Sequence, residues 1–432
     1  MTIALTGIKR GKLKRKETRA IFHPRQVVDV ELSEPLPSLG VNSRGRYNEA
    51  LLLVRLHSYP IAQVMVSLER SLTPEDLAAE LWGALAPSVN TFLKRHGLAP
   101  ADGLADPQLE ALGLSLRAKR EALLGRAPLA SIVICARTHA DNLERCLRSV
   151  IALEYPRYEI IVVERTSKNE AARQVVERLK EVGMPLHYVP LPSASRNTAL
   201  NYVKGQFVAF LEDDQVADKY WLLRLAQGFE RDKNVAAISG AVVPAELEFQ
   251  AQVWGEELAV SSEACGFTPQ SFSLSTHEQS ILFTAPLFGR GSNVAFKTSV
   301  VRKIGFDTTL ETGTPISGIE ESAVCFDLLL AGQTVVYQPS AIVRHYHPRD
   351  VVGLQLQLRA KGLGLAAFYL RCLREQPRLA PTFARLIPRV LHAVLGSKHR
   401  VTKTIPRTLK TAKRRGFLQG FVAYAQSFRN KG

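Results

Sequence analysis

The sequence predicts a doubly wound α/β domain with a mostly parallel sheet over residues 126–348. Two observations predict it: short apolar runs alternate with helical segments, and the apolar runs lack the strict polar–apolar alternation of a half-exposed strand. Strands of that kind are buried on both faces, as in parallel sheets covered by helices. The expected strands are LASIVICA, YEIIVVE, LHYVPL and QFVAFLE, and the expected helices are ADNLERCLRSVIALE, NEAARQVVERLKEVG and SRNTALNYVKG.

Two further regions flank this domain. After a basic arm at residues 1–25, strand-like runs and a helical pattern predict a small α+β module at residues 26–125, in which we find no residues with evident chemistry. Its helix begins in TPEDLAAEL, with Thr73 as the N-cap and Pro74 at the first helical position. Residues 349–432 are basic and Leu-rich, and their pattern predicts amphipathic helices.

The net charge of the chain is +16, and all of this excess lies in the C-terminal region. From Arg349 to Gly432 the chain has 18 Lys and Arg residues and two acids, Asp350 and Glu375. Basic regions attract the phosphates of nucleic acids or of anionic lipids. The aromatic residues do not interleave with the basic ones as stacking platforms would, so we expect no nucleic acid and favour an anionic membrane surface. The alternative is that these helices pack on the rest of the protein or on a second subunit.

Cysteine usage and the N-terminus predict a cytoplasmic protein. The five cysteines are odd in number, scattered and without a CxxC pair, which is typical of reduced thiols in a protein core. The basic N-terminus has no apolar h-region of a signal peptide, and no window has the roughly 18 uncharged apolar residues of a membrane-spanning helix. We therefore expect a cytoplasmic protein, attached peripherally to the inner face of the membrane through its basic region.

Three consecutive acids, Glu212, Asp213 and Asp214, begin at the last residue of the strand QFVAFLE. Adjacent like charges repel one another unless they are compensated or fully solvated, so the triplet is either a divalent-cation site or a solvated acidic turn. Ligands of doubly wound sheets bind at the carboxyl ends of the strands. This rule places the triplet on one rim with Arg137 and Glu164, which follow the first two strands.

The motifs along this domain resemble, in the same order, those of glycosyltransferase family 2, whose members are inverting transferases of the GT-A fold. The resemblance covers about half of the chain, from Leu129 to His347, and rests on six segments: IIVVERTS, SASRNTAL, FLEDD, GRGSNVAFKTSVVRKIGFDTTL, SGIEESAVCFDLLLAG and VVYQPSAIVRHYH. It implies an enzyme of polysaccharide biosynthesis that moves a sugar from a nucleotide-diphosphate sugar, most often a UDP-sugar, to a hydroxyl of a glycan or lipid-linked glycan.

The resemblance implies a divalent metal, Mg²⁺ or Mn²⁺. In the family an Asp-x-Asp-like motif after this strand binds the cation, which neutralises the diphosphate leaving group as the glycosidic bond breaks. Asp214 is the expected ligand, and Asp213 is assigned to substrate binding. Glu212 replaces the first Asp of the motif, so its role is open between metal ligand and ribose contact. His345 matches a histidine after the last strand that can complete the metal or diphosphate site.

A catalytic base is also implied. In inverting transfer the acceptor hydroxyl loses its proton as it attacks, so a carboxylate must lie within hydrogen-bond reach of it. The family places this base in a Gly-x-Glu-Asp segment that opens a helix, and SGIEESAVCFDLLLAG aligns with it without a gap. We assign Glu321, in the place of the Asp, as the base and Glu320 as the second candidate. The alternative is that both acids only complement the helix dipole.

The remaining contacts implied are to the nucleotide and the sugars. Glu164 matches an acid that accepts hydrogen bonds from the base or ribose; alternatively it is an ordinary strand-end carboxylate. Arg196 lies near a helix N-terminus, where an anion is stabilised, and the alternative for it is a surface ion pair. Gly291 lies where the chain passes close to a sugar. The substrate-binding residues expected beyond the acidic triplet are Arg137, Glu164, Arg196, Asn197, Gly291 and Asn293.

Two other classes of protein remain open. Glutamate in place of aspartate at Glu212 and Glu321 would fit a catalytically inactive module that binds sugar nucleotides. A nucleotidyltransferase would make the sugar nucleotide instead of using it. Such an enzyme usually has a Gly-rich, Arg/Lys-bearing signature after its first strand, which ICARTHADN lacks.

Overall fold

The structure, a computed structural model, forms two compact units from segments that are not contiguous in the sequence. The N-terminal unit comprises Met1–Leu123, Pro244–Phe267 and His347–Asp350, and the α/β unit comprises Leu124–Val243, Thr268–Tyr346 and Val351–Gly432. Residues 244–267 and 347–350 thus pack with the N-terminal unit, although 244–267 and 347–348 lie within the predicted domain 126–348. The structure describes residues 2–4, 22–40, 46–136, 140–164, 170–181, 186–190, 196–260, 266–288, 293–310, 316, 318–395 and 405–429.

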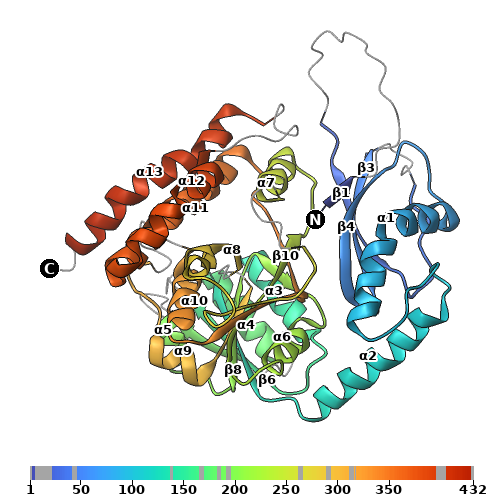
Figure 1. The fold of residues 1–432 in the computed structure, drawn as a ribbon, viewed down its shortest axis with the longest axis horizontal. Helices are drawn as coiled ribbons and strands as arrows, with labels where there is room; N and C mark the ends of the chain where they lie inside the picture. Colours follow the sequence, from blue (N-terminus) through green and yellow to red (C-terminus); the bar gives the residue numbers. More distant parts are fainter. Residues whose placement is uncertain are drawn as a thin grey trace, which may run out of the picture. The chain divides into compact units, whose positions relative to one another are not determined.

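The N-terminal unit is a small α+β module. Its sheet has the order β1-β4-β3-β2, and helix α1 packs on it through a shared apolar core (Figure 1). Helix α1 begins as predicted, because the side chain of Thr73 accepts a hydrogen bond from the backbone N–H of Asp76 and Pro74 is the first helical residue. The elements are β1 (Thr2–Ala4), β2 (Arg25–Glu31), β3 (Glu49–Leu56), β4 (Tyr59–Ser67), α1 (Pro74–Arg95), α2 (Pro107–Gly125) and α7 (Gln250–Val260).

The α/β unit is built on one mixed sheet. Among the described residues it has nine strands, in the order β11-β13-β10-β12-β8-β5-β6-β7, with β9 paired to β13. Strands β8, β5, β6 and β7 are parallel, and β12 is antiparallel to β8. The strands are β5 (Ala130–Ala136), β6 (Tyr158–Glu164), β7 (Leu186–Pro190), β8 (Phe207–Glu212), β9 (Gln215–Ala217), β10 (Val235–Pro244), β11 (Gln270–Phe272), β12 (Val294–Lys297) and β13 (Thr334–His345).

Helices connect these strands, which confirms the predicted α/β fold class. The parallel strands β5, β6, β7 and β8 are joined by α3, α4 and α5 in turn, the alternation that the apolar runs predict. The helices and 3₁₀ turn of this part are α3 (Ala140–Ile151), α4 (Glu170–Glu181), α5 (Arg196–Leu200), α6 (Trp221–Phe229), η1 (Gln279–Thr284), α8 (Ala285–Phe288), α9 (Thr298–Ile304) and α10 (Glu320–Leu330).

The register of the parallel strands aligns their carboxyl ends. Strand β5 lies between β6 and β8, with Ala136 opposite Glu164 and Cys135 opposite Glu212. The last residues of β6 and β8 are therefore acidic and lie at the same level of the sheet, on the rim where a doubly wound fold binds its ligand.

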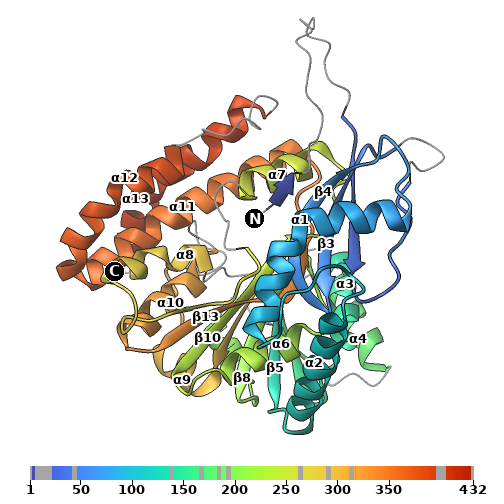
Figure 2. The same cartoon turned by 45° about the vertical axis from the view of Figure 1, so that its right-hand side comes forward.

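The C-terminal region forms helices, as predicted: α11 (Val351–Glu375), the 3₁₀ turn η2 (Pro377–Leu379), α12 (Ala380–Leu395) and α13 (Arg407–Arg429). They lie together in both views (Figures 1 and 2). The backbones of α11 and α13 approach closely, because a Cβ at Gly362 would lie 2.0 Å from the carbonyl oxygen of Lys413, and one at Gly416 would lie 2.0 Å from that of Arg359. In the described ranges, no helix combines the length and the apolar character required to cross a membrane.

Candidate active site

An arginine and two glutamates form a buried ionic cluster at the start of α5 and α10. Nη1 of Arg196 lies 2.5 Å from Oε1 of Glu320, and its Nη2 forms an ion pair with Oε1 of Glu321. Arg196 is 4% exposed, and both glutamates are 0% exposed. The guanidinium also lies over the ring of Phe210 in β8, 5.8 Å from its centroid. The structure thus brings together three of the residues that the sequence predicted, and it places Arg196 in the interior, where it pairs with the candidate bases.

The two glutamates differ in their hydrogen bonds. Oε2 of Glu320 accepts from the backbone N–H groups of Gly318, at 2.9 Å, and Ile319, at 2.8 Å, while its Oε1 accepts from Arg196. Both oxygens of Glu321 are buried, and within the described residues neither accepts a well-formed hydrogen bond. Glu320 is therefore fixed by three donors, whereas among the described residues Glu321 is held mainly by its ion pair with Arg196 and retains lone pairs for a proton.

This environment changes the protonation of the pair. Burial raises the pKa of Glu321 to about 8, against the attraction of Arg196, and the negative charge of Glu320 adds to the increase. Burial by itself lowers the pKa of Arg196, but Glu321 and Glu320 more than offset this effect and raise it. Arg196 therefore stays cationic. A carboxyl with a pKa near neutral pH is well suited to take up a proton during a reaction.

Glu164, at the end of β6, is 1% exposed. Its Oε2 accepts a hydrogen bond from the hydroxyl of Tyr188 in β7, and among the described residues its Oε1 is buried without a hydrogen-bond partner. A buried acceptor without a donor is costly, unless a ligand supplies the donor. The position of Glu164 therefore suits the nucleoside contact that the sequence predicts. Sequence analysis missed Tyr188, an aromatic residue with a polar tip near the end of a strand.

The acidic triplet begins with Glu212, the last residue of β8, and its last member, Asp214, lies next to His345. Nε2 of His345 is 3.4 Å from Oδ2 of Asp214, and the backbone carbonyl of Asp214 accepts from the N–H of Tyr346. Asp213 is buried, while the charge of Glu212 acts on both Arg196 and Glu321.

Two of the three expected metal ligands, Asp214 and His345, thus meet at the end of β8. The described part of the chain contains no group of three or more His, Cys, Asp or Glu side chains arranged to hold a metal ion. The carboxylate of Asp214 still suits a divalent ion that draws its other ligands from substrate phosphates and water, as Mg²⁺ commonly does.

The side-chain amide of Asn293 is hydrogen-bonded to other residues of the fold. Its Nδ2 donates to the carbonyl oxygens of Ala241 and Ala341, each at 2.8 Å, and its Oδ1 accepts from Nε1 of Trp221 at 2.8 Å. These bonds hold β12 to β10, β13 and α6. The predicted contact of this side chain with a sugar would require breaking the network, since both amide hydrogens are used.

Asn197 is engaged in the same way. Its Nδ2 donates to the carbonyl of Phe306, and its Oδ1 accepts from the N–H of the same residue, each at 2.8 Å. The pair fixes α5 to the segment that follows α9. The predictions for Arg137 and Gly291 lie outside the described residues.

A second, partly buried ionic group supports α10, and the sequence did not single it out. Arg371 of α11 donates to both oxygens of Asp327, at 2.9 and 2.7 Å, and its Nε lies 3.4 Å from Oδ2 of Asp307. The signal in the sequence is a single arginine in the apolar run GLAAFYLRCL, because a charge buried in such a run needs a partner. The group ties the C-terminal helices to the helix that carries Glu320 and Glu321.

Fold and site together define a GT-A type domain with carboxylates at the ends of its parallel strands and at the start of α10. Residues 131–305 match the family model described as "Glycosyl transferase family 2". The expectation from the sequence is thereby confirmed: this part of the chain is a family 2 glycosyltransferase domain with the GT-A fold.

Named relatives are similar to this chain over about half of its length. The glucosyl-dolichyl phosphate glucuronosyltransferase of Haloferax volcanii is 24% identical over 230 residues, which are 50% of this chain and 68% of the relative. The pre-mycofactocin glycosyltransferase of Mycobacterium tuberculosis is 28% identical over 226 residues, 50% of this chain and 42% of the relative. The solved structure of the mannosyltransferase PcManGT from Pyrobaculum calidifontis, in complex with GDP-Man and Mn²⁺, is 16% identical with a TM-score of 0.44, over 74% of this chain and 87% of the other.

Proposed function

We propose that this protein is an inverting glycosyltransferase that uses a nucleotide-diphosphate sugar, with a UDP-sugar as the first candidate, and a hydroxyl of a glycan or lipid-linked glycan. The observation that carries the proposal is the environment of the Glu321 carboxyl. It is buried beside the rim where β6 and β8 end, and its pKa is raised to about 8. We further propose that the enzyme acts in the cytoplasm.

In the proposed reaction Glu321 is the base. It accepts the proton of the acceptor hydroxyl while that oxygen attacks the anomeric carbon, and the bond from this carbon to the phosphate oxygen breaks on the opposite face. The new glycosidic bond then has inverted configuration, and the nucleoside diphosphate leaves with the bonding electron pair. Glu321 must be deprotonated at the start, so its ion pair with Arg196 favours the reactive form.

Arg196 and Glu320 orient this base. Glu320 is fixed by the backbone N–H groups of Gly318 and Ile319, and it holds Nη1 of Arg196, so that Nη2 faces Glu321. When Glu321 takes up a proton, Arg196 retains one carboxylate partner. The cluster therefore remains compensated in both protonation states of the base, which limits the electrostatic cost of the step.

The donor would bind along the rim. Oε1 of Glu164, which has no hydrogen-bond partner among the described residues, would accept a hydrogen bond from the nucleoside. Mg²⁺ or Mn²⁺ would be held by Asp214, with His345 3.4 Å from this carboxylate and Glu212 as a further candidate ligand. When bound, such an ion supplies positive charge to the diphosphate.

A panel of nucleotide sugars tests the proposal by thermal shift, with Mn²⁺ and with EDTA. We expect at least one donor to raise the melting temperature with Mn²⁺ and to lose most of this effect with EDTA, because a ligand at 100 times its Kd adds about 2.7 kcal/mol to the stability. Free monosaccharides are the control and should give no shift. If no sugar nucleotide or nucleoside diphosphate stabilises the protein, the proposal fails. An inactive binding module would show the shift but no release of nucleoside diphosphate.

A further inference from the structure

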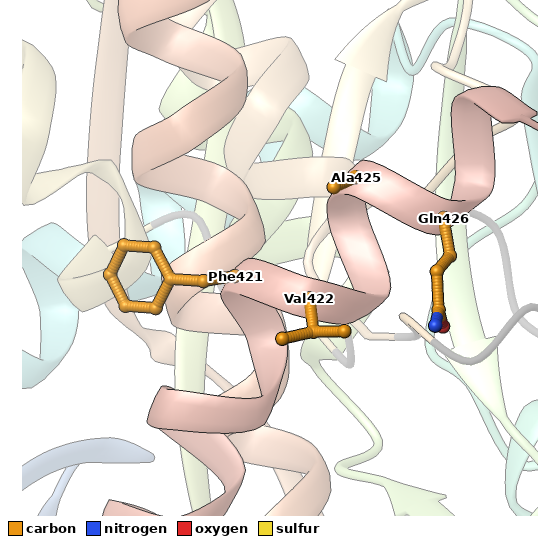
Figure 3. Close-up of a pocket in the computed structure, with 4 residues that line it drawn as sticks. All are labelled: Phe421, Val422, Ala425 and Gln426. Atoms are coloured by element: carbon orange, nitrogen blue, oxygen red, sulfur yellow. The ribbon is translucent and has the colours of Figure 1, made fainter.

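Helix α13 has two faces of different character. Leu409, Ala412 and Phe417 are buried, and Phe417 packs with residues of α11 and α12. Leu418 and Val422, four residues apart and thus on one side of the helix, are 69% and 59% exposed. Figure 3 shows the side chains of Val422 and of Phe421, which is 43% exposed, standing out from the helix.

Exposed apolar side chains are concentrated in this part of the molecule. Of the thirteen large apolar side chains that are exposed in the described ranges, eight belong to helices α11, α12 and α13. Ile387 and Leu391 of α12 are among them, at 42% and 43% exposure. Single exposed apolar residues are common on proteins, but a group of them on neighbouring helices indicates a surface that contacts something apolar.

Positive charge surrounds this group. On α13, Arg415 precedes Leu418 by about one turn and Arg407 precedes it by about three, so both arginines lie on the exposed side. On α12, Arg385 and Arg389 are exposed as well, although their spacing of two residues from Ile387 puts them on a different side of the helix. The region from residue 349 to the end has only two acids against 18 basic residues. A helix with exposed apolar residues on a strongly basic face has the composition of helices that lie in a membrane interface.

We propose that the exposed face of α13, with the adjoining part of α12, binds the surface of an anionic lipid bilayer. Leu418, Phe421 and Val422 would enter the boundary between headgroups and acyl chains, and Arg407 and Arg415 would contact lipid phosphates. A second copy of the same face is a poor partner, because it carries charge of the same sign. The proposal does not depend on the proposed transferase activity, since lipid binding is measured without a sugar donor.

Two apolar segments of the C-terminal region have a similar composition but differ in how far their side chains are exposed. The run LGLAAFYL in α11 is largely interior, with Ala366, Ala367 and Phe368 0% exposed. In GFLQGFVAYA of α13, Phe417 and Tyr424 are buried while Leu418 and Val422 are exposed. The lipid contact is therefore assigned to one face of α13.

Vesicle co-sedimentation of the full chain at low salt tests the proposal. Vesicles of phosphatidylcholine with phosphatidylglycerol are compared with vesicles of phosphatidylcholine alone. Wild type should bind the anionic vesicles, release from them as salt increases, and bind the neutral ones at least about tenfold more weakly. The triple variant Leu418→Ser/Phe421→Ser/Val422→Ser should lose about tenfold or more of its binding. The matched control is Leu114→Ser, which alters an apolar side chain of 61% exposure on α2 and should bind like wild type.

A second variant, Arg407→Gln/Arg415→Gln, removes charge without touching the apolar residues and should lose about tenfold of the affinity for anionic vesicles. Circular dichroism checks whether the triple variant folds. If it does not, the double arginine variant tests the proposal in its place. Three results would overturn the proposal: wild type that ignores anionic vesicles, wild type that binds neutral vesicles equally well, or variants that bind like wild type. A dimer of wild type that the triple variant abolishes would assign this face to a second copy instead.

Discussion

Arg196 and Glu321 form a buried ion pair that joins the first residue of α5 to the first turn of α10. The attraction of Arg196 is the largest of the influences that lower the pKa of Glu321, against the burial that raises it. An arginine that sets the charge of the candidate base has a different role from an arginine that binds the nucleotide, and the two roles predict different results for the same substitution.

Arg196→Gln should shift the pH dependence of donor turnover to higher pH. Without the cation, burial and the charge of Glu320 raise the pKa of Glu321 beyond about 8. Below this pKa, each unit of increase lowers the deprotonated fraction of the base about tenfold. The measurement is kcat against pH for nucleoside diphosphate release, and Arg196→Lys, which keeps the charge, should shift the profile less. A variant with the wild-type pH profile but weakened donor binding would show that Arg196 contacts the nucleotide.

Glu321→Gln should change how stability depends on pH. The pKa of Glu321 is about 8 in the folded protein and 4.5 for an unperturbed glutamate, so between these values the folded state binds more protons at this site than the unfolded chain. The wild-type free energy of unfolding therefore falls as the pH rises through this range. The melting temperature of the variant, relative to wild type, should be higher at about pH 9 than at about pH 5. Calorimetric scans that give the same difference at both pH values would contradict the raised pKa.

Asp214→Asn should abolish the effect of Mn²⁺ on nucleotide binding. The ion links the carboxylate to the diphosphate, so nucleoside diphosphate affinity of the variant should be equally weak with Mn²⁺ and with EDTA, a loss of about tenfold or more. Isothermal titration calorimetry measures both conditions. Asp232→Asn, in the turn before β10, is the control and should retain the response to the metal. Unchanged Mn²⁺-dependent affinity in Asp214→Asn would rule out this residue as a ligand.

Asn293→Ala should destabilise the fold more than it weakens donor binding. It removes the hydrogen bonds to the carbonyls of Ala241 and Ala341 and from Nε1 of Trp221, and each buried group that is left unsatisfied costs about 1–3 kcal/mol. Urea unfolding should show the loss in the free energy of unfolding. If the variant is as stable as wild type but binds the donor poorly, the side chain contacts a sugar, as the motif suggested.

The fold was predictable where local patterns determine it. Continuous apolar runs followed by helical segments predicted the parallel strands, and Thr73 with Pro74 predicted the start of α1, because both signals lie within a few residues. The placement of residues 244–267 with the N-terminal unit was not predictable, since it depends on packing between segments far apart in the sequence.

The sequence predicted which residues form the site, but not which residues each of them contacts. The motifs marked Arg196, Glu320 and Glu321, yet the contact between Arg196 and Glu320 spans 124 positions and depends on how α5 and α10 pack. The difference between the two glutamates arises from a turn at Gly318, whose φ of 83° lies in the left-handed region and whose N–H, like that of Ile319, points at Glu320. Pattern matching could not distinguish their roles, because both are acids in the first turn of one helix.

The release of nucleoside diphosphate by wild type and Glu321→Gln, under saturation with the donor that stabilises the protein and Mn²⁺, tests the central claim most directly. The account predicts that Glu321→Gln binds the donor like wild type and loses about 10²- to 10⁴-fold in kcat, the usual contribution of a positioned base. Glu321→Asp, which keeps a carboxylate, should retain part of the activity. Glu321→Gln that turns over at the wild-type rate would contradict the assignment of Glu321 as the base.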